Sequence, residues 1–131
     1  MTSGVNLVSM NIKKFEDLIV WQKAKDLNII IHNCMIHVND YGYKNQIERA
    51  SLSIMNNIAE GFDRQTTKEY KQFLHISKGS CSEVKSMLYL GLEYEYFNTV
   101  QFNDAYALTE EINKMLYKII QSLELKITNQ S

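Results

Sequence analysis

The chain has 131 residues, the size of one ordinary globular domain. Its 14 basic and 15 acidic residues give a formal net charge of -1, which argues against a protein that coats nucleic acid or anionic membrane by bulk charge. It contains no proline and only 5 glycines, and because these residues interrupt helices, their scarcity favours an all-α fold.

The first predicted helix covers about residues 17–38. Its apolar residues alternate spacings of four and three, which is typical of one face of an amphipathic helix. The sequence at 39–42 then supplies turn-forming residues. The stripe consists of Val20, Ala24, Leu27, Ile31, Cys34 and Val38.

The second predicted helix covers about residues 43–60 and is followed by Gly61. Glycine adopts the left-handed backbone without steric cost, so we expect Gly61 to form the C-terminal cap. The apolar stripe consists of Ile47, Ala50, Ile54 and Ile58.

The third predicted helix runs to about Tyr94 and begins with a capping box, Thr66 and Glu69. In this motif each side chain bonds the backbone N–H of the other residue. The stripe consists of Tyr70, Leu74, Ser77, Cys81, Val84 and Leu88.

The fourth predicted helix covers about residues 99–125. Its stripe consists of Ala105, Leu108, Ile112, Met115, Ile119 and Leu123. Short connections make successive helices antiparallel, so we predict an up-down-up-down antiparallel four-helix bundle. We expect a single domain over 14–126, with tails at 1–13 and 127–131.

The second helix carries a further apolar face outside its stripe. At 100° per residue, Leu52, Met55 and Ala59 lie about 80–140° around the helix from Ile47. This face fits either a wide core with scattered exposed apolar residues, or a surface for self-association. Trp21, with its large apolar ring and its indole N–H, suits a helix seam or the same interface.

Basic residues form a row beside the apolar stripe of the third helix. The row comprises Arg64, Lys68, Lys71, Lys78 and Lys85. Cations on one face can follow the phosphates of nucleic acid, with an affinity that falls as salt rises. The alternative is an ordinary solvated face, and Glu110 and Glu111 of the fourth helix are placed to neutralise the lysines.

No catalytic or metal-binding motif emerges from the sequence. The glycine-rich phosphate loops, the H-E-x-x-H helix and the G-x-S-x-G elbow are all missing. Cys34 and His37 have a helical i, i+3 spacing, but two ligands are too few for structural zinc. We therefore expect no enzymatic activity, no metal and no cofactor.

The sequence also indicates the cellular compartment. Cys34 and Cys81 belong to no C-x-x-C pair, so we expect reduced, buried thiols in a cytoplasmic protein. Residues 1–11 lack the pattern of a signal peptide. The longest apolar run, 87–92, is far below the ~20 residues of a membrane span, so we expect no membrane partner.

Several stretches together resemble one family. They are KFEDLIVWQKA at 14–24, QIERASLSI at 46–54, NIAEGF at 57–62 with Arg64 beyond it, TKEY at 67–70, and ISKGS at 76–80. These segments are similar to the bacterial four-helix-bundle proteins encoded in intervening sequences of 23S ribosomal RNA genes, which are related to an accessory protein of diversity-generating retroelements. The resemblance implies a homo-oligomer, a pentamer in particular, without known enzymatic activity and with a role in binding RNA or DNA.

Within the shared motif we interpret most residues as structural. The Asn57 amide can bridge helices, Glu60 can hold Arg49 or Arg64, and Gly61 lets the chain turn. We therefore expect a homo-oligomeric bundle that binds structured RNA or DNA weakly through its lysine row. The alternative is a scaffold for a partner protein, without direct contact to nucleic acid.

Overall fold

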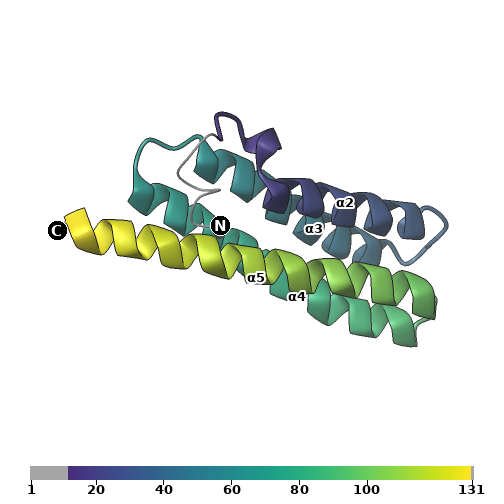
Figure 1. The fold of residues 1–131 in the computed structure, drawn as a ribbon. Coiled ribbons are helices and arrows are strands. Elements are labelled where there is room, and N and C mark those ends of the chain that lie inside the picture. Colours follow the sequence, from purple (N-terminus) through teal and green to yellow (C-terminus); the bar gives the residue numbers. More distant parts are fainter. Residues whose placement is uncertain (1–11, 131) are drawn as a thin grey trace.

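The protein, described here over residues 12–130 by a computed structural model, is built from four long helices that run alternately up and down (Figure 1). A short 3-10 turn, η1 (Phe15–Asp17), precedes α2 (Ile19–Met35), α3 (Tyr41–Phe62), α4 (Thr67–Glu93) and α5 (Thr99–Gln130). No strand occurs over these residues. The predicted all-α four-helix bundle is confirmed.

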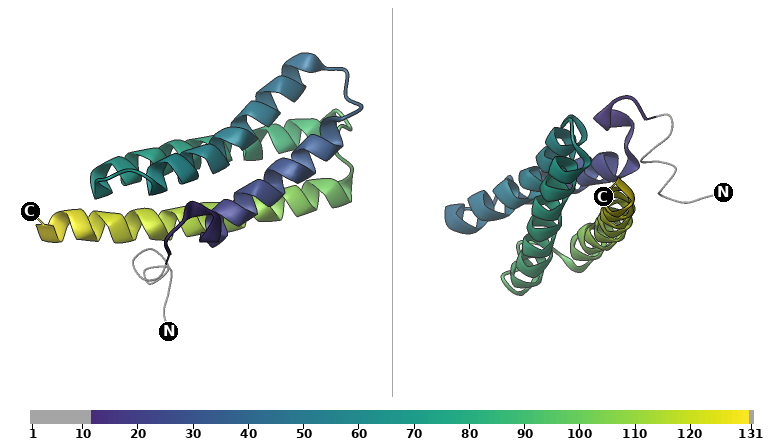
Figure 2. Two further views of the ribbon diagram at one scale, coloured as in Figure 1. Left: turned by 90° about the horizontal axis from the view of Figure 1, so that it is seen from above. Right: turned by 90° about the vertical axis from the view of Figure 1, so that its left-hand side faces the viewer.

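Each helix packs against two neighbours. Helix α3 contacts α2 and α4, and α5 contacts the same two helices from the other side. Over the described part of the chain, the backbones of the diagonal pairs, α2–α4 and α3–α5, stay apart. The helices therefore stand at the four corners of a bundle, as the two views in Figure 2 show.

The predicted apolar stripes form the core of the bundle. In α3 and α4 every residue of the predicted stripe is buried. In α2 and α5 the stripe is partly wrong: Cys34, Leu108 and Met115 are only half-buried, whereas Met35 and Leu116 are fully buried. A spacing of 3.5 residues drifts around a helix of 3.6 residues per turn, which moves the buried face toward these neighbours.

The helix ends differ from the prediction at several places. Helix α3 begins at Tyr41, inside the predicted turn 39–42, and ends at Phe62. Helix α2 ends at Met35, before the predicted Val38. Helix α5 continues to Gln130, beyond the predicted end at Leu125, so most of the expected tail 127–131 is helical. The apolar pattern fades after Leu123, but no glycine or proline follows to stop the helix. Of the expected tail 1–13, residues 1–11 lie outside the described residues.

The predicted role of Gly61 is wrong. Gly61 lies inside α3, and no glycine of the described chain has a positive φ. A Cβ added at Gly61 would lie 2.7 Å from the Phe73 Cβ and 3.0 Å from the Tyr70 Cδ1. The position is therefore occupied by glycine because α4 approaches α3 closely there.

Candidate functional site

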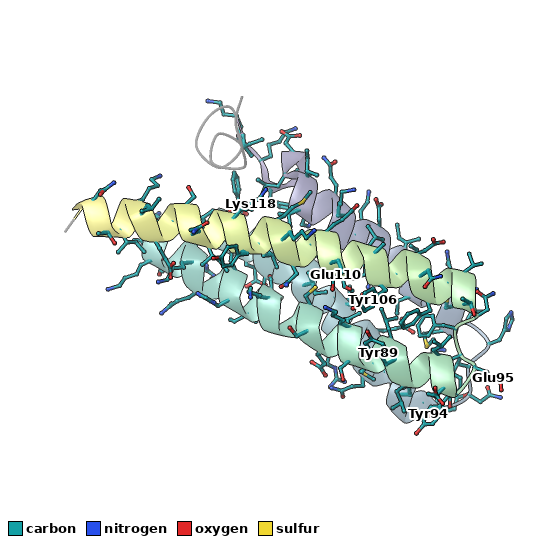
Figure 3. The ribbon with its side chains drawn as sticks, turned by 60° about the horizontal axis from the view of Figure 1, so that its bottom comes forward. Tyr89, Tyr94, Glu95, Tyr106, Glu110 and Lys118 are labelled. Carbon is teal, nitrogen blue, oxygen red and sulfur yellow. The ribbon has the colours of Figure 1, made fainter. Side chains whose placement is uncertain are left out.

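Antiparallel contacts between α4 and α5 determine where the predicted lysine row lies. Lys85 forms an ion pair with Glu110, and the Lys71 Nζ lies 3.5 Å from the Glu124 Oε2. In two antiparallel helices, residues that lie level have numbers with a constant sum. This sum is the same for both pairs, so both belong to one register. Figure 3 shows this side of α4 and α5, with Glu110 labelled. Lys71 and Lys85 of the predicted row therefore lie along the line of contact between α4 and α5, which we call the α4–α5 groove.

Three of the five predicted cations are paired with a carboxylate. Besides Lys71 and Lys85, the Arg64 guanidinium lies 3.8 Å from Glu60. Lys68 and Lys78 form no ion pair with the described residues. In the common register Lys78 stands level with Tyr117, an exposed side chain that carries no charge to neutralise it.

Of the two acidic residues predicted to neutralise the lysine row, Glu110 pairs with a lysine of the row and Glu111 does not. Hydrogen bonding between Lys85 and Glu110 raises the pKa of the lysine and lowers the pKa of the carboxyl group, so both groups are charged at neutral pH. Glu111 instead pairs with Lys23 of α2, at 3.0 Å. The row therefore carries less net positive charge than its sequence implies.

A second basic cluster was missed by the sequence analysis. Lys114 and Lys118 line a shallow hollow between α2 and α5. The other lining residues are Met115 and the ion pair of Lys23 with Glu111. Neither Lys114 nor Lys118 forms an ion pair within residues 12–130. Their i, i+4 spacing on α5 was the available signal, and Lys118 is labelled in Figure 3.

The predicted interface residues converge on one side of α2 and α3. The Asn28 amide donates to the Ser51 hydroxyl at 2.6 Å, and the His32 Nδ1 lies 3.2 Å from the Glu48 Oε1. These two contacts determine the antiparallel register of α2 and α3. In that register Trp21 lies level with Ala59.

We call this surface the α2–α3 face and define it by Trp21, Ile29, Leu52, Met55 and Ala59. Leu52 is 44% exposed and Ile29 is 48% exposed, while the other three are half-buried. The Trp21 ring packs edge-on against Phe15, with ring centroids 5.2 Å apart. Single exposed apolar residues are normal, but a contiguous group of them marks an interaction surface.

The motif residues hold α3 together more than they join it to other helices. The Asn57 amide donates to the Ser53 carbonyl at 2.8 Å, within the same helix, so the predicted direct bridge to another helix is wrong. The link to α4 passes instead through the Ser53 hydroxyl, which lies 2.8 Å from the Ser80 hydroxyl. Short serine side chains provide this contact because they let the two backbones approach.

Of the two predicted partners of Glu60, Arg49 and Arg64, the structure pairs Glu60 with Arg64. Arg49 is exposed and forms no ion pair in the described part of the chain. The Arg64 guanidinium also lies over the Phe73 ring, 4.7 Å from its centroid. Arg64 is therefore held at the α3–α4 turn by an aromatic face as well as by a carboxylate.

Aromatic side chains gather at the opposite end of the bundle, a feature that the sequence analysis did not predict. The Tyr89 hydroxyl of α4 donates a hydrogen bond to the Tyr106 hydroxyl of α5 at 3.2 Å. Phe102 stacks on Tyr106 with centroids 5.5 Å apart. Figure 3 shows this end, including Tyr94 and Glu95, and Glu95 alone among the described non-glycine residues has a positive φ, 63°.

Over residues 12–130 no three histidine, cysteine or acidic side chains meet in a way that could hold a metal ion. None of the described helices combines the length and the apolarity needed to cross a bilayer. Burial raises the pKa of the Cys81 thiol to about 11 and also raises the pKa of the Cys34 thiol. Neither thiol lies in the kind of electropositive, open setting that activates cysteine.

These features define an antiparallel four-helix bundle with a charged α4–α5 groove and an apolar α2–α3 face. Residues 16–118 match the 23S rRNA-intervening sequence protein family, and the chain belongs to that family. A similar solved structure is that of a protein of unknown function from the S23 ribosomal protein family of Bacteroides thetaiotaomicron. It has a TM-score of 0.70 and 27% sequence identity, and the match covers 78% of this chain and 98% of that one. No curated protein matches the sequence.

Proposed function

We propose that this protein is a non-enzymatic, self-associating helical bundle, whose copies meet through the α2–α3 face. The observation that carries the proposal is the convergence of exposed and half-exposed apolar side chains from two helices on one side of a small bundle. Burying this face against a second copy removes apolar surface from water. The resemblance to the family makes a pentamer the expected assembly.

Light scattering coupled to size-exclusion chromatography tests self-association. The wild type is expected to elute as an oligomer at micromolar concentration, and L52Q/M55Q is expected to elute as a monomer. L125Q is the matched control, because Leu125 is 61% exposed but lies on α5, outside the α2–α3 face. A monomeric wild type, or an L52Q/M55Q assembly equal to that of the wild type, would contradict the proposal.

The second candidate function is weak binding of structured RNA or DNA through the lysine row. It is favoured by Lys68 and Lys78, which form no ion pair with the described residues, and by Arg64, whose ion pair with Glu60 is long. Exposed ion pairs contribute only about 0–1 kcal/mol, so phosphates can displace some of the carboxylates. Repetition of a weak site around an oligomer would raise the affinity.

Titration with hairpin RNA and duplex DNA at two salt concentrations tests this function. Charge reversal at the unpaired lysine, K78E, is expected to weaken binding more than the equal charge change K85E, because Lys85 already has a carboxylate partner. Binding should also fall as salt rises. No binding at low salt, or binding that K78E does not change, would contradict this function. The alternative is a scaffold for a partner protein, and a pull-down in which the partner protein stays bound after nuclease treatment would support it.

A further inference from the structure

A small hollow opens where the α3–α4 turn meets the last turns of α5. Its volume is about 210 Å³, well above the ~15 Å³ that one water molecule requires. Arg64 and Lys126 line it together with the hydroxyl side chains of Thr66 and Thr67. No carboxylate of the described chain is among the lining residues. The hollow therefore has a positive and hydrogen-bond-donating wall.

The hollow also contains the N-terminus of α4, a helix of 27 residues. The Thr66 side chain accepts from the Glu69 N–H at 3.1 Å, and the Thr66 carbonyl accepts from the Tyr70 N–H at 3.1 Å. The N–H groups of Thr67 and Lys68 have no acceptor among the described residues. Free N–H groups and the positive end of the helix dipole both favour an anion.

A third, independent observation concerns Tyr70. This residue lines the hollow and keeps only 9% of its surface exposed. Its hydroxyl is buried and has no hydrogen-bond partner over residues 12–130. Buried polar groups are almost always hydrogen-bonded, so an unpartnered donor beside a basic hollow indicates a missing acceptor.

We propose that this hollow binds a phosphate group. The Arg64 guanidinium and the Lys126 ammonium supply the charge, and the first N–H groups of α4 bind the phosphate oxygens. The Tyr70 hydroxyl, which belongs to a residue that lines the hollow, supplies a further donor. Lys126 has no ion pair in the described part, and the contact of Arg64 to Glu60 is long, at 3.8 Å. The Arg64 guanidinium also lies over the Phe73 ring, but this contact uses its flat face and leaves its in-plane N–H donors free for an anion.

Chemical-shift titration with inorganic phosphate, at constant ionic strength against chloride, tests the site directly. The amide signals of Thr67 and Lys68 are expected to move and to saturate in the millimolar range. R64Q and K126Q should each weaken binding about tenfold, the loss expected for one charge-assisted contact. Y70F, which keeps the ring, should weaken it about threefold, the loss expected for one neutral hydrogen bond.

K114Q is the matched control, because Lys114 also lies on α5 without an ion pair but lines a different hollow. Phosphate affinity should not change in this variant. If the wild type shows no saturable shift, or if R64Q, K126Q and K114Q all bind phosphate as the wild type does, the site does not exist.

The phosphate could be free or could belong to nucleic acid, and oligonucleotides distinguish the two. Tighter binding of a 5′-phosphorylated single strand than of the same strand with a 5′-hydroxyl assigns the site to a terminal phosphate. If the two strands bind equally and R64Q abolishes the binding of both, the site binds the backbone phosphates. Binding of inorganic phosphate alone assigns it to a small molecule, and this result would stand even if the nucleic-acid function proposed above failed.

Discussion

Glycine is required at Gly61 by the approach of two helices and not by backbone conformation. In G61A, the added methyl would meet the Phe73 Cβ at 2.7 Å and the Tyr70 carbonyl oxygen at 3.3 Å, so α3 and α4 must separate. Overpacking of this kind costs about 1–3 kcal/mol, more than the ~1 kcal/mol that alanine gains from its helix propensity. We expect urea unfolding to show a net destabilisation.

Gly79, on α4, provides the opposite case. A Cβ added there meets nothing within 4 Å, so G79A should stabilise the protein by up to ~1 kcal/mol in the same urea measurement. If both variants shift the free energy of unfolding in the same direction, close packing at Gly61 is not what requires glycine.

The two thiols should differ in reactivity because they differ in burial. Cys81 is 2% exposed, and burial raises its pKa to about 11, so at pH 8 its thiolate is present at only about one part in a thousand. With a disulfide reagent at that pH, half-buried Cys34 should react first and Cys81 only slowly. In C34S, the rate at Cys81 should rise with pH toward about 11. Equal rates in the native protein would contradict this assignment.

At the scale of the helix, side-chain caps stabilise the helix starts, and the sequence predicted the cap of α4 but not that of α5. The predicted Thr66 cap is present, but the Glu69 carboxylate bonds the Thr66 hydroxyl at 3.2 Å in place of the backbone N–H. The reciprocal box occurs instead at α5. The Gln101 N–H donates to Asn98 Oδ1 at 2.8 Å, and the Asn98 N–H donates to Gln101 Oε1 at 2.9 Å.

Removing this box should destabilise the bundle. N98A loses the side-chain acceptor at the start of α5, at a cost of about 1 kcal/mol. N103A is the control, since Asn103 is exposed within the same helix and alanine there gains a few tenths of a kcal/mol of helix propensity. Urea unfolding should therefore move in opposite directions for the two variants. An unchanged midpoint for N98A would mean that the cap contributes nothing.

The helices and most of the core could be predicted because their causes are local. A stripe such as Ile47, Ile54 and Ile58 repeats within one segment, and the capping residue stands beside the helix that it begins. The end of α5 could not be predicted, because an exposed helix continues until something stops it. The role of Gly61 was not predictable either, since it depends on Phe73 of another helix.

At the scale of the whole molecule, the charge of a surface depends on register between helices. The lysine row is visible in the sequence, but its cancellation depends on Glu110 and Glu124 lying level with Lys85 and Lys71. A shift of α5 by one turn would separate both pairs, because no acidic residue of α5 would then lie level with Lys71 or Lys85. The unpartnered Tyr70 hydroxyl is likewise a result of packing, because no local pattern marks a tyrosine whose partner is missing.

Self-association and nucleic-acid binding are coupled if the lysine row acts through repetition. The α2–α3 face and the α4–α5 groove lie on different helix pairs, so L52Q/M55Q leaves every basic residue in place and changes no charge. Linked weak sites gain affinity by about 10²–10⁴-fold over a single site. The monomeric variant should therefore bind hairpin RNA far more weakly than the wild type does, whereas L125Q should bind equally. Fluorescence anisotropy at low salt measures both, and undiminished binding by the monomer would show that each subunit binds alone.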